Sequence, residues 1–260
     1  MSRRRAADSA VARQGEGNND TIDLETELNT IHFVKGKNMF FIRKIVALIV
    51  MMFVSLVANA AINAPENGKE FTVLANVQAT PADKKIEVIE FFAYTCPHCY
   101  ALDPLLENWI KKQGSAINFK RVHVSDQRAI PPLKLFLTLE TMGKADELQS
   151  KIFNAVHVER VRLFSDAAVL EFIARTGIDK QKFSDIYNSF TIQTKLNRAA
   201  QQMDAYKINS WPTLIIDGRF VTSPSMAAVS LGRTTEEGQN QALLPVLDWL
   251  VARAQKEKKN

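Results

Sequence analysis

The chain has 260 residues, of which 46% are hydrophobic, so it is long enough to bury a real core in one domain with an insertion or in two small domains. Residues 1–60 hold eight Lys or Arg and six Asp or Glu, which leaves 25 basic against 22 acidic residues for the rest of a chain whose formal charge is +5. So small an excess argues against a nucleic-acid partner, and two cysteines are too few for a four-cysteine zinc site.

Residues 39–60 are expected to be a secretory signal peptide. The segment has a short basic start that ends at Lys44, an apolar run over residues 45–57, and a small-x-small cleavage signature that ends at Ala60. A permanent membrane anchor is the alternative, but the apolar run is shorter than the ~20 residues that a spanning helix needs. Residues 1–38 are then interpreted as lying upstream of the true start at Met39, or as a disordered tail.

After a short strand expected over residues 70–74, residues 86–92 form an apolar run typical of a buried parallel strand. Glu87 is near the start of this run and is expected to reach solvent. Glu90 lies between two apolar residues, and burial there would raise its pKa and suit it to exchange a proton with the Cys99 thiol. An edge glutamate paired with a lysine is the alternative for Glu90.

The strand is followed by Cys96-Pro97-His98-Cys99 at the start of a predicted helix. Pro97 suits the first helical position, so Cys96 is placed at the N-cap with its sulfur facing the free N–H groups of the first turn. Those donors and the positive end of the helix dipole favour the thiolate and lower the pKa of Cys96. Cys99 is on the same helical face, close enough to close a small disulfide ring. The motif therefore predicts a redox centre.

Two other interpretations of the cysteine pair are weaker. A closed structural zinc site needs four ligands, and the chain offers no further cysteine and, outside the motif, only the imidazoles of His32, His123 and His157. A purely structural disulfide in so small a ring would restrain little unfolded-chain entropy.

The helix is expected to end at Gly114 and to be followed by a strand over residues 116–122, which makes a right-handed parallel crossover. Strand signals then vanish from residue 127 to about residue 207. Helices are expected instead at 133–142, 146–156, 166–176, 179–183 and 191–203. We therefore place an inserted helical domain at 126–200, between two parts of an α/β domain at 61–125 and 201–260.

The last part of the chain returns to strand chemistry. Asp217-Gly218 between two apolar runs is a strong hairpin signal, and Pro212 stands where a strand opens. An amphipathic helix is expected over residues 241–254, with its regular part beginning near Pro245.

Three features point to one family: Phe-Phe-Ala-Tyr-Thr-Cys-Pro-His-Cys-Tyr after a buried strand, a long helical insertion, and Trp-Pro-Thr-Leu-Ile-Ile-Asp-Gly-Arg-Phe near the end. Together they resemble the DsbA family of periplasmic thiol:disulfide oxidoreductases over nearly the whole mature chain. The resemblance implies an α/β, thioredoxin-like fold with an inserted all-helical domain.

The resemblance also implies roles for individual residues. Cys96 would be the exposed nucleophile and Cys99 the buried resolving cysteine, with Pro212 as the cis-proline opposite their disulfide. Glu90 matches the buried acid beneath the motif. The Pro97–His98 pair is the form found in oxidising members, in which His98 stabilises the Cys96 thiolate.

One departure from the family pattern concerns substrate binding. Trp211 stands where relatives usually place a smaller residue before the cis-proline, so Trp211 and its neighbour Ser210 are expected to shape the groove for substrate peptides.

The function that we expect is a monomeric periplasmic oxidase that donates the Cys96–Cys99 disulfide to cysteine pairs of newly secreted proteins through a mixed disulfide on Cys96. It would need no bound cofactor besides this redox-active disulfide. The family further implies a quinone-linked membrane partner, similar to DsbB, that reoxidises the pair. A reductase or isomerase of the same fold, and a peptide-binding chaperone with incidental redox activity, are the alternatives.

Overall fold

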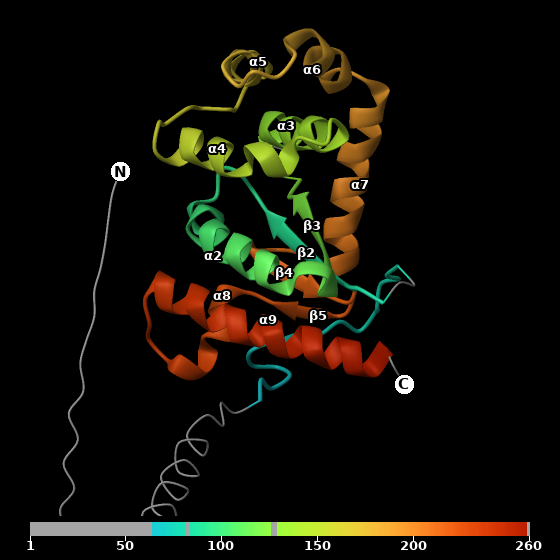
Figure 1. Ribbon diagram of the computed structural model, residues 1–260, viewed down its shortest axis with the longest axis vertical. Helices are drawn as coiled ribbons and strands as arrows, with labels where there is room; N and C mark the ends of the chain where they lie inside the picture. The colour runs from blue at the N-terminus through green and yellow to red at the C-terminus, as the bar shows by residue number, and fades with distance from the viewer. Residues whose placement is uncertain (1–63, 82–83, 126–128, 259–260) are drawn as a thin grey trace, which may run out of the picture. The chain divides into compact units, whose positions relative to one another are not determined.

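We describe residues 64–81, 84–125 and 129–258 of a computed structural model of the protein (Figure 1). The expected signal peptide at 39–60 and the segment 1–38 lie outside these described residues. No helix within the described ranges is both long enough and apolar enough to cross a membrane.

The described strands form one five-stranded mixed sheet in the order β1-β5-β4-β2-β3. Only β2 and β3 are parallel among the neighbouring pairs of this sheet, as the predicted crossover requires. The strands are β1 (Thr72–Val73), β2 (Ile86–Phe92), β3 (Ile117–His123), β4 (Thr213–Ile216) and β5 (Phe220–Thr222).

Strand β2 has neighbours on both sides, and all seven of its residues are buried. The expectation that Glu87 reaches solvent is therefore wrong. Its carboxylate is only 7% exposed and pairs with Nζ of Lys120 on β3 at 2.5 Å, which compensates the charge that the sheet buries.

Helices α2 (Pro97–Gln113) and α9 (Glu236–Lys258) pack together on one face of the sheet (Figure 1). They run in the same direction, because His98 meets Glu236 near both N-termini while Trp109 donates a hydrogen bond to Asp248 at 2.8 Å further along. Helix α9 begins at Glu236 and passes through Pro245, so the expected start of regular helix near Pro245 is wrong.

The predicted hairpin at Asp217-Gly218 is present between β4 and β5. Asp217 and Gly218 have φ of 53° and 65°, the left-handed conformation that such turns need. A Cβ on Gly218 would lie 2.3 Å from the carbonyl oxygen of Gln78, whose own N–H donates to the Gly218 carbonyl at 2.9 Å. The glycine is thus required both for the turn and for the close approach of the segment before β2.

Between β3 and β4 the described chain is helical, and Figure 1 shows these helices beyond one end of the sheet, with α7 descending along it. The tyrosine ring of Tyr206 at the end of α7 contacts Phe91 of β2, with ring centroids 5.6 Å apart. The fold is the α/β sheet with a helical insertion that the sequence predicts. The helices are α3 (Ile130–Thr141), α4 (Ala145–His157), α5 (Asp166–Ala174), α6 (Lys180–Tyr187) and α7 (Phe190–Tyr206).

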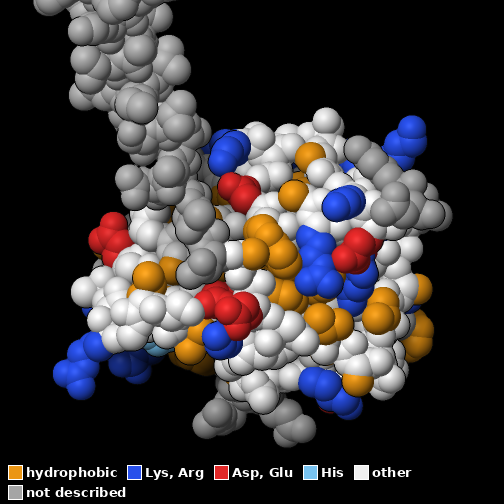
Figure 2. Space-filling view, turned by 90° about the horizontal axis from the view of Figure 1, so that it is seen from below, with side chains coloured by type: hydrophobic (Ala, Val, Ile, Leu, Met, Phe, Trp, Pro, Cys, Tyr) orange, Lys and Arg blue, Asp and Glu red, His pale blue; other side chains and the backbone are white. Residues whose placement is uncertain are grey.

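Among the described residues, the remaining elements are the short helix α8 (Pro224–Ala227) and two 3₁₀ turns, η1 (Gly114–Ala116) and η3 (Val229–Leu231). Seen from below, the surface carries basic and acidic side chains scattered among apolar ones (Figure 2). Ion pairs join the end of α9 to the β4–β5 turn, including Arg219 with Glu257 at 2.5 Å.

Candidate active site

The N-terminus of α2 holds Cys96 as its N-cap residue, as the position of Pro97 predicts. Cys96 has an extended backbone, and its sulfur accepts a hydrogen bond from the N–H of Cys99 at 3.4 Å. The two cysteines are not joined by a disulfide in this structure. The hydrogen bond from the Cys99 thiol, the N–H groups of the first turn and the charge of His98 lower the pKa of Cys96 to about 6, although burial opposes them.

The second cysteine has the opposite environment. Cys99 is fully buried, and burial together with the neighbouring Cys96 raises its pKa. Cys96 keeps only 7% of its surface exposed, so it is less open than the family resemblance implies, although it is the more accessible of the two. The pair therefore combines one sulfur that favours the anion with one that favours the neutral thiol.

The loop before β4 lies directly against Cys96. The Trp211–Pro212 peptide bond is cis, as the resemblance implies, and the Trp211 carbonyl oxygen is 3.7 Å from the Cys96 sulfur. The Thr213 hydroxyl donates to the Ser210 carbonyl at 2.8 Å, which fixes the turn. Ser210 is exposed and Trp211 is half-buried, so both border the surface beside the thiol.

His98 is exposed and its imidazole contacts an acid from the other end of the chain. Its Nδ1 atom is 2.5 Å from Oε1 of Glu236, the first residue of α9. The hydrogen bond and charge of Glu236 raise the pKa of His98, and the nearby Cys96 sulfur adds to the effect. A positive imidazole is thereby favoured two residues after the nucleophile.

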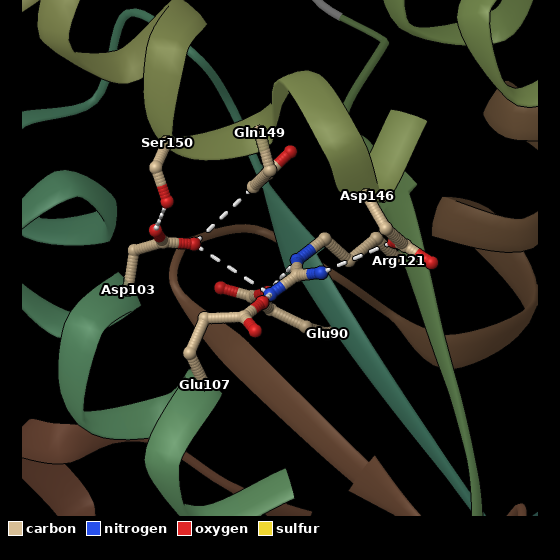
Figure 3. A network of polar contacts seen from close by, with 7 residues as sticks. All are labelled: Glu90, Asp103, Glu107, Arg121, Asp146, Gln149 and Ser150. Carbon is tan, nitrogen blue, oxygen red and sulfur yellow. Dashed lines mark hydrogen bonds and ion pairs between the residues drawn. The ribbon is translucent and has the colours of Figure 1, made fainter. Parts of the chain in front are cut away.

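Beneath the motif, Glu90 is buried and pairs with Arg121 of β3, the residue opposite it in the parallel register. The Arg121 Nε atom donates to Glu90 at 3.0 Å. Figure 3 shows further partners of this guanidinium: Glu107 at 2.6 Å, Asp146 at 3.5 Å and Asp103 at 3.6 Å. The expected burial of Glu90 is confirmed. Its partner is a buried arginine, so the alternative of an edge glutamate paired with a lysine is wrong.

The Arg121 cluster, which we define as Glu90, Asp103, Glu107, Arg121 and Asp146, has unequal protonation tendencies. Burial raises the pKa of Glu90 to about 7, against the opposing charge of Arg121. Burial also raises the pKa of Asp103, which accepts a hydrogen bond from the Ser150 hydroxyl at 3.3 Å. Burial works against the charge of Arg121, but the surrounding carboxylates outweigh it and raise the pKa of the guanidinium.

Two histidines outside the motif, His123 and His157, bind the backbone of Tyr94 just before Cys96. His123 accepts the N–H of Tyr94 at its Nε2 atom, 3.1 Å away, and burial lowers its pKa to about 4, so the ring is neutral. His157 at the end of α4 donates a hydrogen bond to the Tyr94 carbonyl at 2.9 Å. Its ring stacks on that of Tyr100, with ring centroids 4.8 Å apart. The part of the chain that the structure describes contains no group of three or more His, Cys, Asp or Glu able to hold a metal.

Comparisons with known proteins agree with this geometry. Residues 87–230 match the family model described as DSBA-like thioredoxin domain. The chain is 39% identical over 203 residues to a thiol:disulfide interchange protein DsbA of Burkholderia cepacia, which covers 77% of this chain and 91% of that protein. It is 42% identical over 144 residues to the thiol:disulfide interchange protein DsbA of Bordetella parapertussis, and this match covers 55% of this chain and 68% of that protein.

The structure is also similar to solved ones. The crystal structure of Pseudomonas aeruginosa DsbA matches with a TM-score of 0.66 and 29% identity, over 75% of this chain and 97% of that one. The fold, the cysteine pair at the N-terminus of α2 and the sequence likeness agree, and the chain belongs to the DsbA family of thiol:disulfide oxidoreductases.

Proposed function

We propose that the protein is an oxidase that donates its Cys96–Cys99 disulfide to cysteine pairs of newly secreted proteins. The observation that carries the proposal is the contrast between the two sulfurs, because Cys96 is held by helix N–H groups and Cys99 is enclosed in the core. A disulfide is a strong oxidant when its reduced form is unusually stable, and these donors stabilise the reduced form as a Cys96 thiolate. The site therefore favours transfer of the disulfide from this protein to its substrate.

The exchange has two steps. A substrate thiolate attacks the Cys96 sulfur, the Cys96–Cys99 bond breaks, and Cys99 leaves and takes up a proton. The second substrate thiolate then attacks the substrate sulfur of the mixed disulfide, and Cys96 leaves as a thiolate. The substrate loses two electrons to form its disulfide, and the protein gains them as the reduced pair.

Glu90 is proposed to supply the proton that Cys99 needs. Its pKa of about 7 lets it hold a proton near neutral pH, and its charge acts on the Cys99 thiol from within the same buried region. Glu90→Gln is expected to slow exchange and to remove the pH dependence of the exchange rate near pH 7 while leaving the fold intact. If the variant and the wild type have the same rate at each pH from 6 to 8, Glu90 does not have this role.

Trp211 and Ser210 are proposed to contact the substrate peptide. They flank the thiol on the loop whose carbonyl lies 3.7 Å from Cys96. The indole adds a large apolar surface there, so Trp211→Val should change the preference among cysteine peptides more than it changes the redox equilibrium. The same ranking of a peptide panel by both proteins would contradict the role.

The proposed setting is the periplasm, reached after cleavage near Ala60. Regeneration would come from a quinone-linked membrane partner similar to DsbB, and the oxidase would act as a monomer without a bound cofactor. These proposals follow from the family membership and from the signal-like segment 39–60.

The test is to mix the oxidised protein with a reduced, unfolded substrate that has two cysteines and to measure the equilibrium with glutathione. We expect rapid substrate oxidation. A Cys99→Ser variant that first carries glutathione as a mixed disulfide on Cys96 should exchange it for a one-cysteine version of the substrate. Glutathione leaves as the thiol, and the mixed disulfide between Cys96 and the substrate should accumulate because no second thiol resolves it. Cys96→Ala is the control, because it should abolish oxidation. A Cys96 that titrates near the ordinary value of ~8.5, with no transfer to the substrate, would overturn the proposal. Suppression of aggregation that persists in Cys96→Ala would favour the chaperone alternative.

A further inference from the structure

The inference concerns Glu236, the first residue of α9, which lies outside the cysteine motif and far from it in sequence. Its carboxylate is 2.5 Å from the His98 imidazole, and the two residues are 138 positions apart. His98 is the second residue of α2 and is followed directly by Cys99. Glu236 therefore reaches the redox motif only through the folding of α9 against α2 (Figure 1).

The position of His98 is unfavourable for a positive charge. It is in the first turn of α2, where the free N–H groups and the helix dipole favour anions and oppose cations. Helix α9 runs in the same direction as α2, so a second helix N-terminus lies at the same end of the molecule. Without a compensating anion, the imidazole at this place is expected to be neutral at pH 7.

Glu236 supplies that anion at hydrogen-bond distance. The side chains of His98 and Glu236 are 67% and 48% exposed, so the pair is accessible to solvent and to salt. The groups that act on the His98 charge are Glu236 from α9 and the Cys96 sulfur from its own motif, and both favour the protonated ring. The charge of His98 in turn favours the Cys96 thiolate.

We propose that Glu236 is a positioning residue that holds His98 as an imidazolium beside Cys96 and so makes the Cys96–Cys99 disulfide more oxidising. This inference rests on the proposed oxidase function. The coupling between His98 and Cys96 is reciprocal: the Cys96 thiolate favours the charged imidazole as much as the charged imidazole favours the thiolate. Because both partners are partly exposed, the effect is modest and sensitive to salt.

The experiment measures the equilibrium between the protein and glutathione in the wild type and in Glu236→Gln. Two glutathione thiols are oxidised to one glutathione disulfide, while the Cys96–Cys99 bond accepts two electrons and is reduced. At pH 7.5 we expect the constant for reduction of the protein to fall about two- to fivefold in Glu236→Gln. At pH 5 the two proteins should agree, because His98 is protonated in both.

A second readout isolates the imidazole. NMR titration of His98 should show a lower pKa in Glu236→Gln than in the wild type, and Glu236→Asp should restore part of the difference. Glu237→Gln is the matched control, because it removes the same charge from the same first turn of α9 without a contact to His98. It should leave both the titration and the equilibrium unchanged.

A double-mutant cycle decides whether Glu236 acts through His98. In a His98→Gln background, Glu236→Gln should have no further effect on the glutathione equilibrium. An equal effect with and without His98, or a wild-type equilibrium constant in Glu236→Gln at pH 7.5, would overturn the inference. If the oxidase proposal itself fails, the wild type will already be a weak oxidant, whereas failure of this inference alone leaves a strong oxidant in both proteins.

Discussion

Two ion pairs near the redox motif join distant parts of the chain, and their surroundings differ completely. Arg121 and Glu90 are 5% and 1% exposed, whereas His98 and Glu236 are 67% and 48% exposed. Removing one partner of a buried pair leaves an uncompensated charge in a medium of low dielectric, while removing one partner of an exposed pair leaves a charge that water solvates. The buried pair should therefore govern folding, and the exposed pair should adjust chemistry with little effect on stability.

The largest effect is expected for Arg121→Met, which leaves Glu90 in the core without its cation. The free energy of unfolding should fall by about 3–5 kcal/mol at pH 8, as is usual when one partner of a buried pair is lost. The loss should be smaller at pH 5, because a protonated Glu90 needs no counterion. Denaturant unfolding at both pH values measures this, with Lys111→Met on the exposed side of α2 as the control. Equal losses at pH 5 and pH 8 would count against an electrostatic origin.

The next effect is the pH dependence that Glu90 itself imposes on stability. Its folded pKa of about 7 is above the ordinary value of 4.5, so the folded state holds a proton that the unfolded state releases. The contribution is fully present below pH 4.5 and is lost as the pH rises to about 7, by roughly 3 kcal/mol in total. Glu90→Gln should flatten the unfolding free energy across this window; a profile parallel to that of the wild type would contradict the assignment.

The same contrast explains what the sequence could predict about the site. The N-cap position of Cys96, the helix after Pro97 and the turn at Asp217-Gly218 depend on residues within a few positions of one another, and the structure confirms all three. Local rules of capping and turn conformation suffice for such features. The burial of Glu90 was also predictable, because it lies inside an apolar run.

The partners of these residues were not predictable, because they depend on register and packing. Arg121 faces Glu90 only because β2 and β3 pair in one parallel register, and an alternating strand alone does not reveal that register. The start of α9 at Glu236 was missed because Pro245 was interpreted as the first turn of the helix. The contacts of α9 with α2 stabilise the preceding turns as well, and these bring Glu236 to His98.

A third prediction tests the comparison within the Arg121 cluster. Asp146 is 3.5 Å from the same guanidinium as Glu90, but its side chain is 95% exposed. Asp146→Asn should therefore change the free energy of unfolding by less than ~1 kcal/mol, and 1 M salt should remove the difference. Glu90→Gln at pH 8 is the comparison variant in the same denaturant experiment. A loss for Asp146→Asn as large as that for Arg121→Met would show that exposure is not what separates the two classes of pair.

The smallest effect on stability is expected for the exposed pair itself. Glu236 raises the pKa of His98 in the folded state, so the stability that it adds is present below pH 6.5 and fades as the pH rises through the folded value. Because both side chains are largely solvated, Glu236→Gln should lower the free energy of unfolding by less than ~1 kcal/mol at pH 6 and by nothing measurable at pH 9. Glu237→Gln again provides the control for the first turn of α9. A large loss at both pH values would mean that Glu236 holds α9 in place, and its influence on Cys96 would then have to be separated from a change in helix packing.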